Sequence, residues 1–79
     1  MKVWQRLCGN EWAFGVPVRG LIRDMEGEVY FDEDNDDRRG GWVWFTRIKG
    51  PDGQPIRGLA YSLLAAVAEV ERVLQEAEP

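Results

Sequence analysis

Histidine is absent from this chain, and cysteine occurs once, as Cys8, among 79 residues. Histidine is the commonest metal ligand and the only side chain whose ordinary pKa lies near neutrality, so its absence argues against a zinc site. A single cysteine cannot form an internal disulfide. Because so short a chain buries little apolar surface, we expect it to gain stability by binding a larger partner or a second copy of itself.

Long apolar runs are missing as well. The longest, residues 59–68, contains Ser62 and is far shorter than the roughly 20 residues that span a bilayer. The first residues also lack the apolar stretch of a signal peptide. A lone thiol without an export signal predicts a cytoplasmic protein. Because 44% of the residues are hydrophobic, the chain is expected to fold rather than to stay disordered.

Patterns typical of strands fill the first 49 residues. They occupy residues 2–8, 12–23, 28–32 and 42–49, separated by turn signals at residues 9–10 and 25–27. The second segment contains Pro17, which cannot donate to a strand ladder, so we expect an edge strand or a bent one there.

The segment 42–49 has the strongest strand pattern, because it is aromatic, β-branched and free of breakers. Alternation divides it into one face with Trp42, Trp44, Thr46 and Ile48 and another with Val43, Phe45, Arg47 and Lys49. If a helix covers the face of Val43 and Phe45, then Trp42 and Trp44 are exposed and mark an interface. The alternative is that most of these rings pack in the core.

A turn is predicted over residues 50–58, and a helix follows over about 59–77. Its apolar residues recur at spacings of three and four, at Leu59, Leu63, Val67, Val70, Leu74 and Ala77. The sequence therefore predicts one α+β domain over residues 1–79. A three- to four-stranded antiparallel sheet over about 2–49 packs against one C-terminal helix.

A block of carboxylates is the strongest functional signal. Between residues 24 and 37 the chain has eight acids and no base, although its net charge is only −4: Asp24, Glu26, Glu28, Asp32, Glu33, Asp34, Asp36 and Asp37. One interpretation is a solvated hairpin that protects a sheet edge. The other is a surface that replaces the phosphates of a nucleic acid, since a local field of one sign attracts partners of the opposite sign.

Calcium binding is a weaker interpretation of the same block. Asp32, Asp34 and Asp36 alternate as the first three ligands of an EF-hand loop do. The sixth position then holds Asp37 instead of glycine, and the twelfth holds Val43 instead of glutamate. We therefore predict neither a metal nor a cofactor.

Two arginines, Arg38 and Arg39, follow the acids directly. They either compensate the acidic charge locally or form a contact hot spot, where arginine is enriched. Catalysis has little support, because the chain has no nucleophile motif, no phosphate-binding glycine loop and no sign of a pocket that would tune its carboxylates. We predict that the chain is not an enzyme.

Direct binding to nucleic acid is a further alternative. The order of elements in residues 40–74 resembles that of small DNA-binding modules of phage integrases and plant transcription factors. Such modules are basic across the sheet, and here only Arg47, Lys49 and Arg57 serve that purpose beside the acidic block. Because that block repels phosphate, we expect no direct contact with nucleic acid.

With its small size, sheet-and-helix pattern and acidic segment DMEGEVYFDEDNDD, the chain resembles the small anti-CRISPR proteins of phages and prophages. Phage inhibitors of uracil-DNA glycosylase and of restriction enzymes are acidic in a similar way. The resemblance implies an inhibitor in the bacterial cytoplasm that mimics DNA and blocks the basic channel of a CRISPR surveillance complex. The predicted partner-binding residues are Glu28, Asp32, Glu33, Asp34, Asp36, Asp37, Arg38, Arg39, Trp42 and Trp44. The alternative is a protein–protein interaction module, antitoxin-like or a phage accessory protein, that forms a homodimer.

Overall fold

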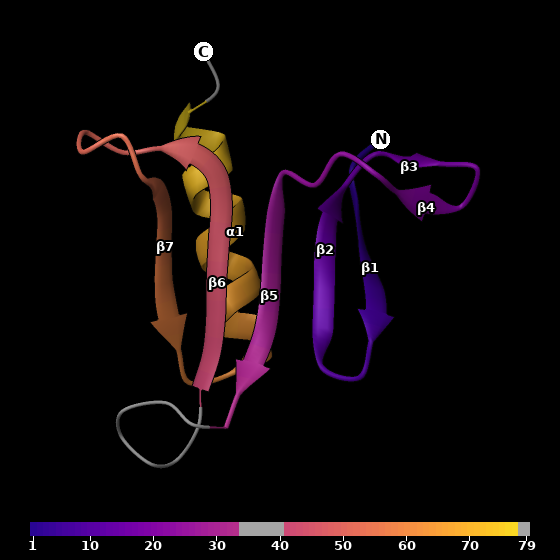
Figure 1. Cartoon of the computed structure of the whole chain (residues 1–79), viewed down its shortest axis with the longest axis horizontal. Coiled ribbons are helices and arrows are strands. Elements are labelled where there is room, and N and C mark those ends of the chain that lie inside the picture. Colours follow the sequence, from indigo (N-terminus) through magenta and orange to yellow (C-terminus); the bar gives the residue numbers. More distant parts are fainter. Residues whose placement is uncertain (34–40, 78–79) are drawn as a thin grey trace.

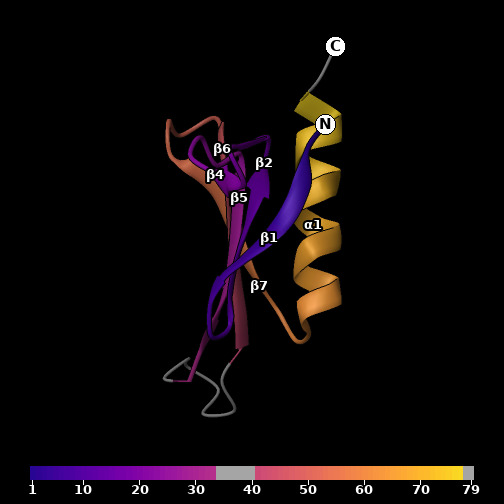
Figure 2. The same cartoon turned by 90° about the vertical axis from the view of Figure 1, so that its right-hand side faces the viewer.

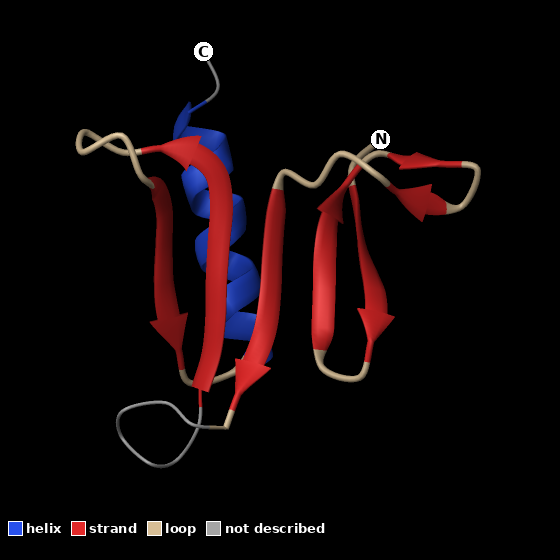
Figure 3. Ribbon diagram, in the orientation of Figure 1, coloured by secondary structure: helices blue, strands red, loops and turns tan. Residues whose placement is uncertain are grey.

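The fold is α+β, with a five-stranded antiparallel sheet and one C-terminal helix (Figures 1 and 3). The computed structural model describes residues 1–33 and 41–77. The strand order is β1-β2-β5-β6-β7, formed by Val3–Cys8, Glu11–Gly15, Gly27–Asp32, Gly41–Lys49 and Pro55–Ala60. Within the described residues, no helix is long and apolar enough to cross a membrane.

The prediction of three to four strands was too low, because residues 55–60 form a strand and not a turn. Strand β7 lies at the edge of the sheet and begins with Pro55, and both an edge strand and a first position tolerate proline. The helix α1, Leu63–Ala77, consequently begins four residues later than predicted. Leu59, assigned to the apolar stripe of the helix, belongs to β7 and is 46% exposed.

Residues 12–23 do not form one bent strand. After β2 the chain makes a small hairpin of its own from β3, Pro17–Val18, and β4, Leu21–Ile22. Arg19 and Gly20 at its tip both have positive φ angles, 54° and 82°, as a two-residue turn of a tight hairpin requires. The predicted turn at residues 25–27 is also displaced, since Gly27 is already the first residue of β5.

The side chain of Gln5 holds this hairpin against the sheet. Its Nε2 donates to the carbonyl oxygen of Gly20 at 2.6 Å, and its Oε1 accepts from the backbone N–H of Ile22 at 3.0 Å. The carboxamide therefore supplies β4 with one donor and one acceptor, as a neighbouring strand would. Ile22 is buried as a result, and its Cγ2 lies next to Gly15.

Helix α1 covers only one side of the sheet, mainly across β6 with β5 and β7 beside it (Figure 2). Its start is capped by Ser62, whose Oγ accepts from the N–H of Ala65 at 3.1 Å. The buried face of the helix consists of Ala66, Val70, Val73 and Leu74. Leu63 and Val67 pack at its margin, as their spacing predicted, whereas Ala77 is exposed.

The core forms where this helix meets Val29 and Trp44, which are paired across β5 and β6. Val29 is fully buried, and Trp44 is 6% exposed. The indole of Trp44 lies over Gly58 of β7, where a Cβ atom would come within 2.6 Å of Trp44 Cζ2. Glycine at position 58 thus makes room for the largest ring of the core.

We expect Gly58→Ala to destabilise the fold by about 1–3 kcal/mol, because the added methyl forces the Trp44 ring or the β7 backbone to move. Urea unfolding followed by tryptophan fluorescence measures the change. Gly50→Ala is the matched control, since its nearest new contact is a side-chain oxygen of Asp52 at 3.4 Å, an ordinary van der Waals distance. Equal stability of the Gly58 variant and wild type would contradict the tight packing.

We expect Gln5→Ala to release the β3–β4 hairpin while the five-stranded sheet stays intact, since the variant loses both hydrogen bonds to β4. Amide exchange at Ile22 should accelerate about fivefold or more, as expected for a loss of about 1 kcal/mol per bond. The control is Arg6→Ala, which changes the adjacent side chain, bonded to Gly9 instead. Unchanged protection of Ile22 would rule out the Gln5 bridge.

Candidate functional site on the free face of the sheet

The side of the sheet that faces away from α1 is the candidate site and is called the free face here. Its residues follow from the strand register, because directly paired residues point to the same side. One row across the strands is Gln5, Ala13, Glu28, Phe45 and Arg57, and the next is Glu11, Tyr30, Val43 and Leu59. Along β5 and β6, residues of the free face alternate with residues that lie under the helix. Val29 and Trp44 belong to the second set and point toward α1.

Charge on the free face is divided between its two halves. Glu11 and Glu28 lie on the neighbouring strands β2 and β5. Arg47 and Lys49 at the end of β6 and Arg57 on β7 make the other half basic. Phe45 on β6 lies between Glu28 and Arg57, and the next row holds the apolar side chains of Tyr30, Val43 and Leu59. The Tyr30 and Phe45 rings meet edge to face with their centroids 5.8 Å apart.

Glu28 is the most perturbed acid of this face. Partial burial between its neighbouring strands raises the pKa of the Glu28 carboxyl above its ordinary value of 4.5, and the nearby charge of Glu11 raises it further. Neither Glu11 nor Glu28 forms an ion pair with another described residue. Two unpaired carboxylates on adjacent strands therefore produce a concentrated negative potential here.

Asp32 and Glu33 continue this acidic surface at the end of β5. Asp32 pairs with Gly41 at the start of β6, and Glu33 is exposed just beyond the strand. The turn between β1 and β2, and Glu11 with it, lies at the same end of the sheet (Figure 1). The other predicted contact residues, namely Asp34, Asp36, Asp37, Arg38 and Arg39, lie outside the described residues.

The first two acids of the block contact bases that are distant in sequence. The carboxylate of Asp24 lies 3.4 Å from the guanidinium of Arg47, and that of Glu26 lies 3.0 Å from Nζ of Lys2. Both acids are thereby neutralised in part. The block that is continuous in sequence is therefore split by folding, because Asp24 and Glu26 contact distant bases whereas Glu28 forms no ion pair with another described residue.

The prediction of Trp44 as a contact residue is wrong. Helix α1 packs on the face of Trp42 and Trp44 and not on that of Val43 and Phe45, so Trp44 is in the core. Trp42 is half-buried against that core, with its ring 5.2 Å from that of Phe31. The alternative prediction, that most of these rings pack inside, is confirmed for this pair.

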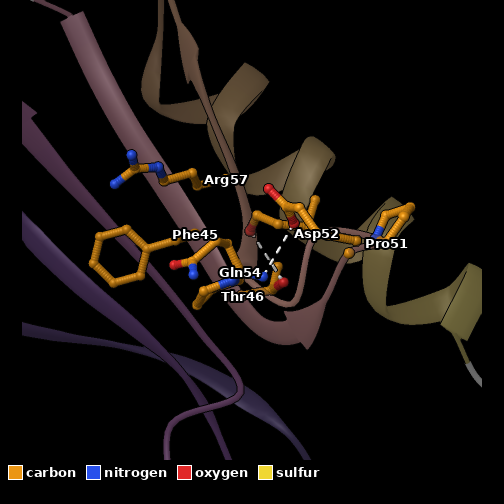
Figure 4. Close-up of a pocket in the computed structure, with 9 residues that line it drawn as sticks. Phe45, Thr46, Pro51, Asp52, Gln54 and Arg57 are labelled. Atoms are coloured by element: carbon orange, nitrogen blue, oxygen red, sulfur yellow. Dashed lines mark hydrogen bonds between the residues drawn. The ribbon is translucent and has the colours of Figure 1, made fainter.

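A wide hollow of about 760 Å³ lies where the end of the β6–β7 hairpin curls beside Phe45 and Arg57 (Figure 4). Pro51, Asp52, Gln54 and Ile56 form its other walls. The Asp52 carboxylate is already engaged, because it accepts from the backbone N–H of Gln54 at 3.0 Å. The hollow therefore offers an apolar floor and one exposed guanidinium, which suits a contact surface.

Several residues of this face were missed in the sequence because their partners are far away along the chain. Glu11 comes to Glu28 only through the β2–β5 pairing, and Arg57 comes beside Phe45 only through β7. The alternation of residues 42–49 did carry a usable signal, since it placed Val43, Phe45, Arg47 and Lys49 on one side. Deciding which side the helix covers required the tertiary structure.

Metal binding has no structural basis in residues 1–33 and 41–77, where no three Cys, Asp or Glu side chains gather closely enough to hold an ion. Comparisons of the chain with models of protein families, with curated proteins and with solved structures found no match. The function must therefore be argued from the residues of the free face.

We expect Glu28→Gln to stabilise the protein at pH 7 by about a few tenths of a kcal/mol, the scale of partly exposed charges. The pKa of Glu28 is raised on folding, so its contribution to stability is full below pH 4.5 and is lost as the pH rises through the folded-state pKa. The gain should therefore vanish in acid. Urea unfolding at both pH values tests this, with exposed Glu33→Gln as control. A gain that persists in acid would contradict it.

Proposed function

We propose that the chain is a small non-enzymatic inhibitor that binds the basic, nucleic-acid-binding surface of another protein and blocks access of DNA. The observation that carries the proposal is the arrangement of carboxylates on β2 and β5. On the free face Glu11 and Glu28 form no ion pair with another described residue, and Asp32 and Glu33 extend the acidic surface at the end of the sheet.

The spacing of these groups supports mimicry of a phosphate backbone. Glu11 and Glu28 are diagonal neighbours on paired strands, and such neighbours are about 7–8 Å apart. Glu28 and Asp32 lie on the same side of β5, about 13 Å apart along the strand. A phosphate-binding channel spaces its lysines and arginines over similar lengths, because DNA carries one phosphate per about 3.4 Å along each strand.

A rigid support makes these charges effective. Strand β5 is paired on both sides, to β2 and to β6, and its alternate residues are held under α1. The carboxylates are therefore fixed before binding, and little conformational freedom is lost when a basic partner docks. Counterions held by the partner are released at the same time, so we expect binding to weaken as salt concentration rises.

A CRISPR surveillance complex is the partner we propose, because the chain resembles anti-CRISPR proteins in its small size, its antiparallel sheet with one helix and its acidic segment. Such complexes hold target DNA in channels of lysine and arginine and read a short adjacent motif. An acidic strand end can occupy either region. The second candidate is a protein–protein interaction module, antitoxin-like or a phage accessory protein, that binds another copy of itself. The apolar side chains of the free face favour this candidate.

We expect replacement of Asp32, Glu33, Asp34, Asp36 and Asp37 by Asn or Gln to weaken inhibition at least about tenfold, because each lost carboxylate removes a charge-assisted contact. Displacement of labelled target DNA from purified CRISPR complexes measures inhibition at two salt concentrations. The matched control replaces Glu69, Glu71 and Glu76 of α1 with Gln, since these acids are exposed or half-buried on the covered side. Undiminished inhibition by a folded five-acid variant would remove the proposal.

A further inference from the structure

On the free face, residues of opposite charge lie on the two sides of strand β6. In one row Glu28, Phe45 and Arg57 are directly paired across β5, β6 and β7. In the next row Tyr30, Val43 and Leu59 are paired in the same order. At about 4.8 Å per strand, Glu28 and Arg57 lie about 10 Å apart on opposite sides of Phe45. On these three strands, a row with opposite charges at its two ends thus lies next to a row of apolar side chains.

We propose that the free face binds a second copy of this chain, face to face, about a twofold axis that runs along β6. This rotation exchanges the β5 side of one copy with the β7 side of the other. Glu28 of each copy then faces Arg57 of its mate, and Phe45 meets Phe45 on the axis. A twofold contact requires such a self-complementary patch, because the same surface serves both copies.

Charge distinguishes this axis from the other way of stacking two sheets. A twofold axis in the sheet plane but perpendicular to the strands would leave each strand opposite itself. Glu28 would then face Glu28, next to the nearby Glu11 charge, and Arg57 would face Arg57. Like charges in contact oppose association, so the charge pattern selects the axis along β6.

The apolar row supplies the attraction. Leu59 is 46% exposed and lies opposite Tyr30 of the other copy in this arrangement, while Val43 meets Val43. Sheets that stack face to face are separated by about 10 Å, which side chains of this size fill. A standard interface buries about 800 Å² per copy, roughly a seventh of this chain's surface of 5738 Å².

A second copy complements both halves of this face, whereas a uniformly basic protein complements only its acidic half. Such a protein would meet Arg47, Lys49 and Arg57 over half of the surface. A second copy meets a charge of opposite sign at both ends of the row. The dimer does not rest on the proposed function, because it uses Glu28 and Arg57, whereas Asp32 and Glu33 lie beyond the two paired rows.

Charge reversal tests the dimer by sedimentation equilibrium, starting from a monomer mass of 9.1 kDa. We expect wild type to reach twice this mass, and Glu28→Arg or Arg57→Glu alone to raise the dissociation constant at least about tenfold, because each places like charges in contact. An equimolar mixture of the two single variants should dimerise again. In that mixed pair the two native side chains face each other, and so do the two reversed ones.

Glu71→Arg on the covered side is the control and should leave association unchanged. Circular dichroism of each variant establishes that it is folded. Wild type that remains monomeric up to about 1 mM protein would overturn the proposal. So would a dimer that survives both single reversals, or two folded single variants that fail to associate when mixed. A wild type that stays monomeric would not change the result of the DNA-displacement experiment. The proposed dimer and the proposed inhibitor function can therefore be disproved independently.

Discussion

The packing of Val70 and its neighbours on Val29 and Trp44 determines which side of the sheet is covered and which stays open. Val29 and Val70 are both fully buried, and this contact requires close approach of α1 to β5. Gly27 permits it, because a Cβ atom there would run into Cγ1 of Val70. Gly58 plays the matching role for the ring of Trp44. Because α1 packs on the side of Val29 and Trp44, the strand residues that alternate with these core residues point away from the helix and form the free face.

Strand order then determines where charge collects. The acidic strand β5 lies between β2, which adds Glu11, and β6, which ends in Arg47 and Lys49 and pairs with the β7 strand of Arg57. Acids and bases that the chain separates into blocks therefore become neighbouring columns with an apolar centre. The same order pairs Asp24 with Arg47 and Glu26 with Lys2, so part of the acidic block is used internally. The acidic surface that remains for a partner is therefore smaller than the eight acids of the sequence indicate, and its position on the sheet is better defined.

The sequence predicted the fold class and most of the strands, since the alternation in residues 28–32 and 42–49 and the spacing of Leu63, Val67, Val70 and Leu74 are strong local signals. It failed at β7, because Pro55 and Gly58 are typical of turns and only the pairing with β6 makes them part of a strand. It also missed the β3–β4 hairpin, which depends on the side chain of Gln5. The candidate site was predicted in its acidic part only, because Glu11 and Arg57 join it through long-range pairing.

All four tryptophans lie in one layer of the molecule. The register places Trp4, Trp12, Trp42 and Trp44 on the side of the sheet that α1 occupies, and the aromatic rings of the free face are those of Tyr30 and Phe45. Indole emission therefore reports the helix-covered layer and is nearly blind to the opposite surface. A ligand that docks on the free face leaves this intrinsic optical signal almost unchanged, so titrations of that face need a label or a tyrosine signal.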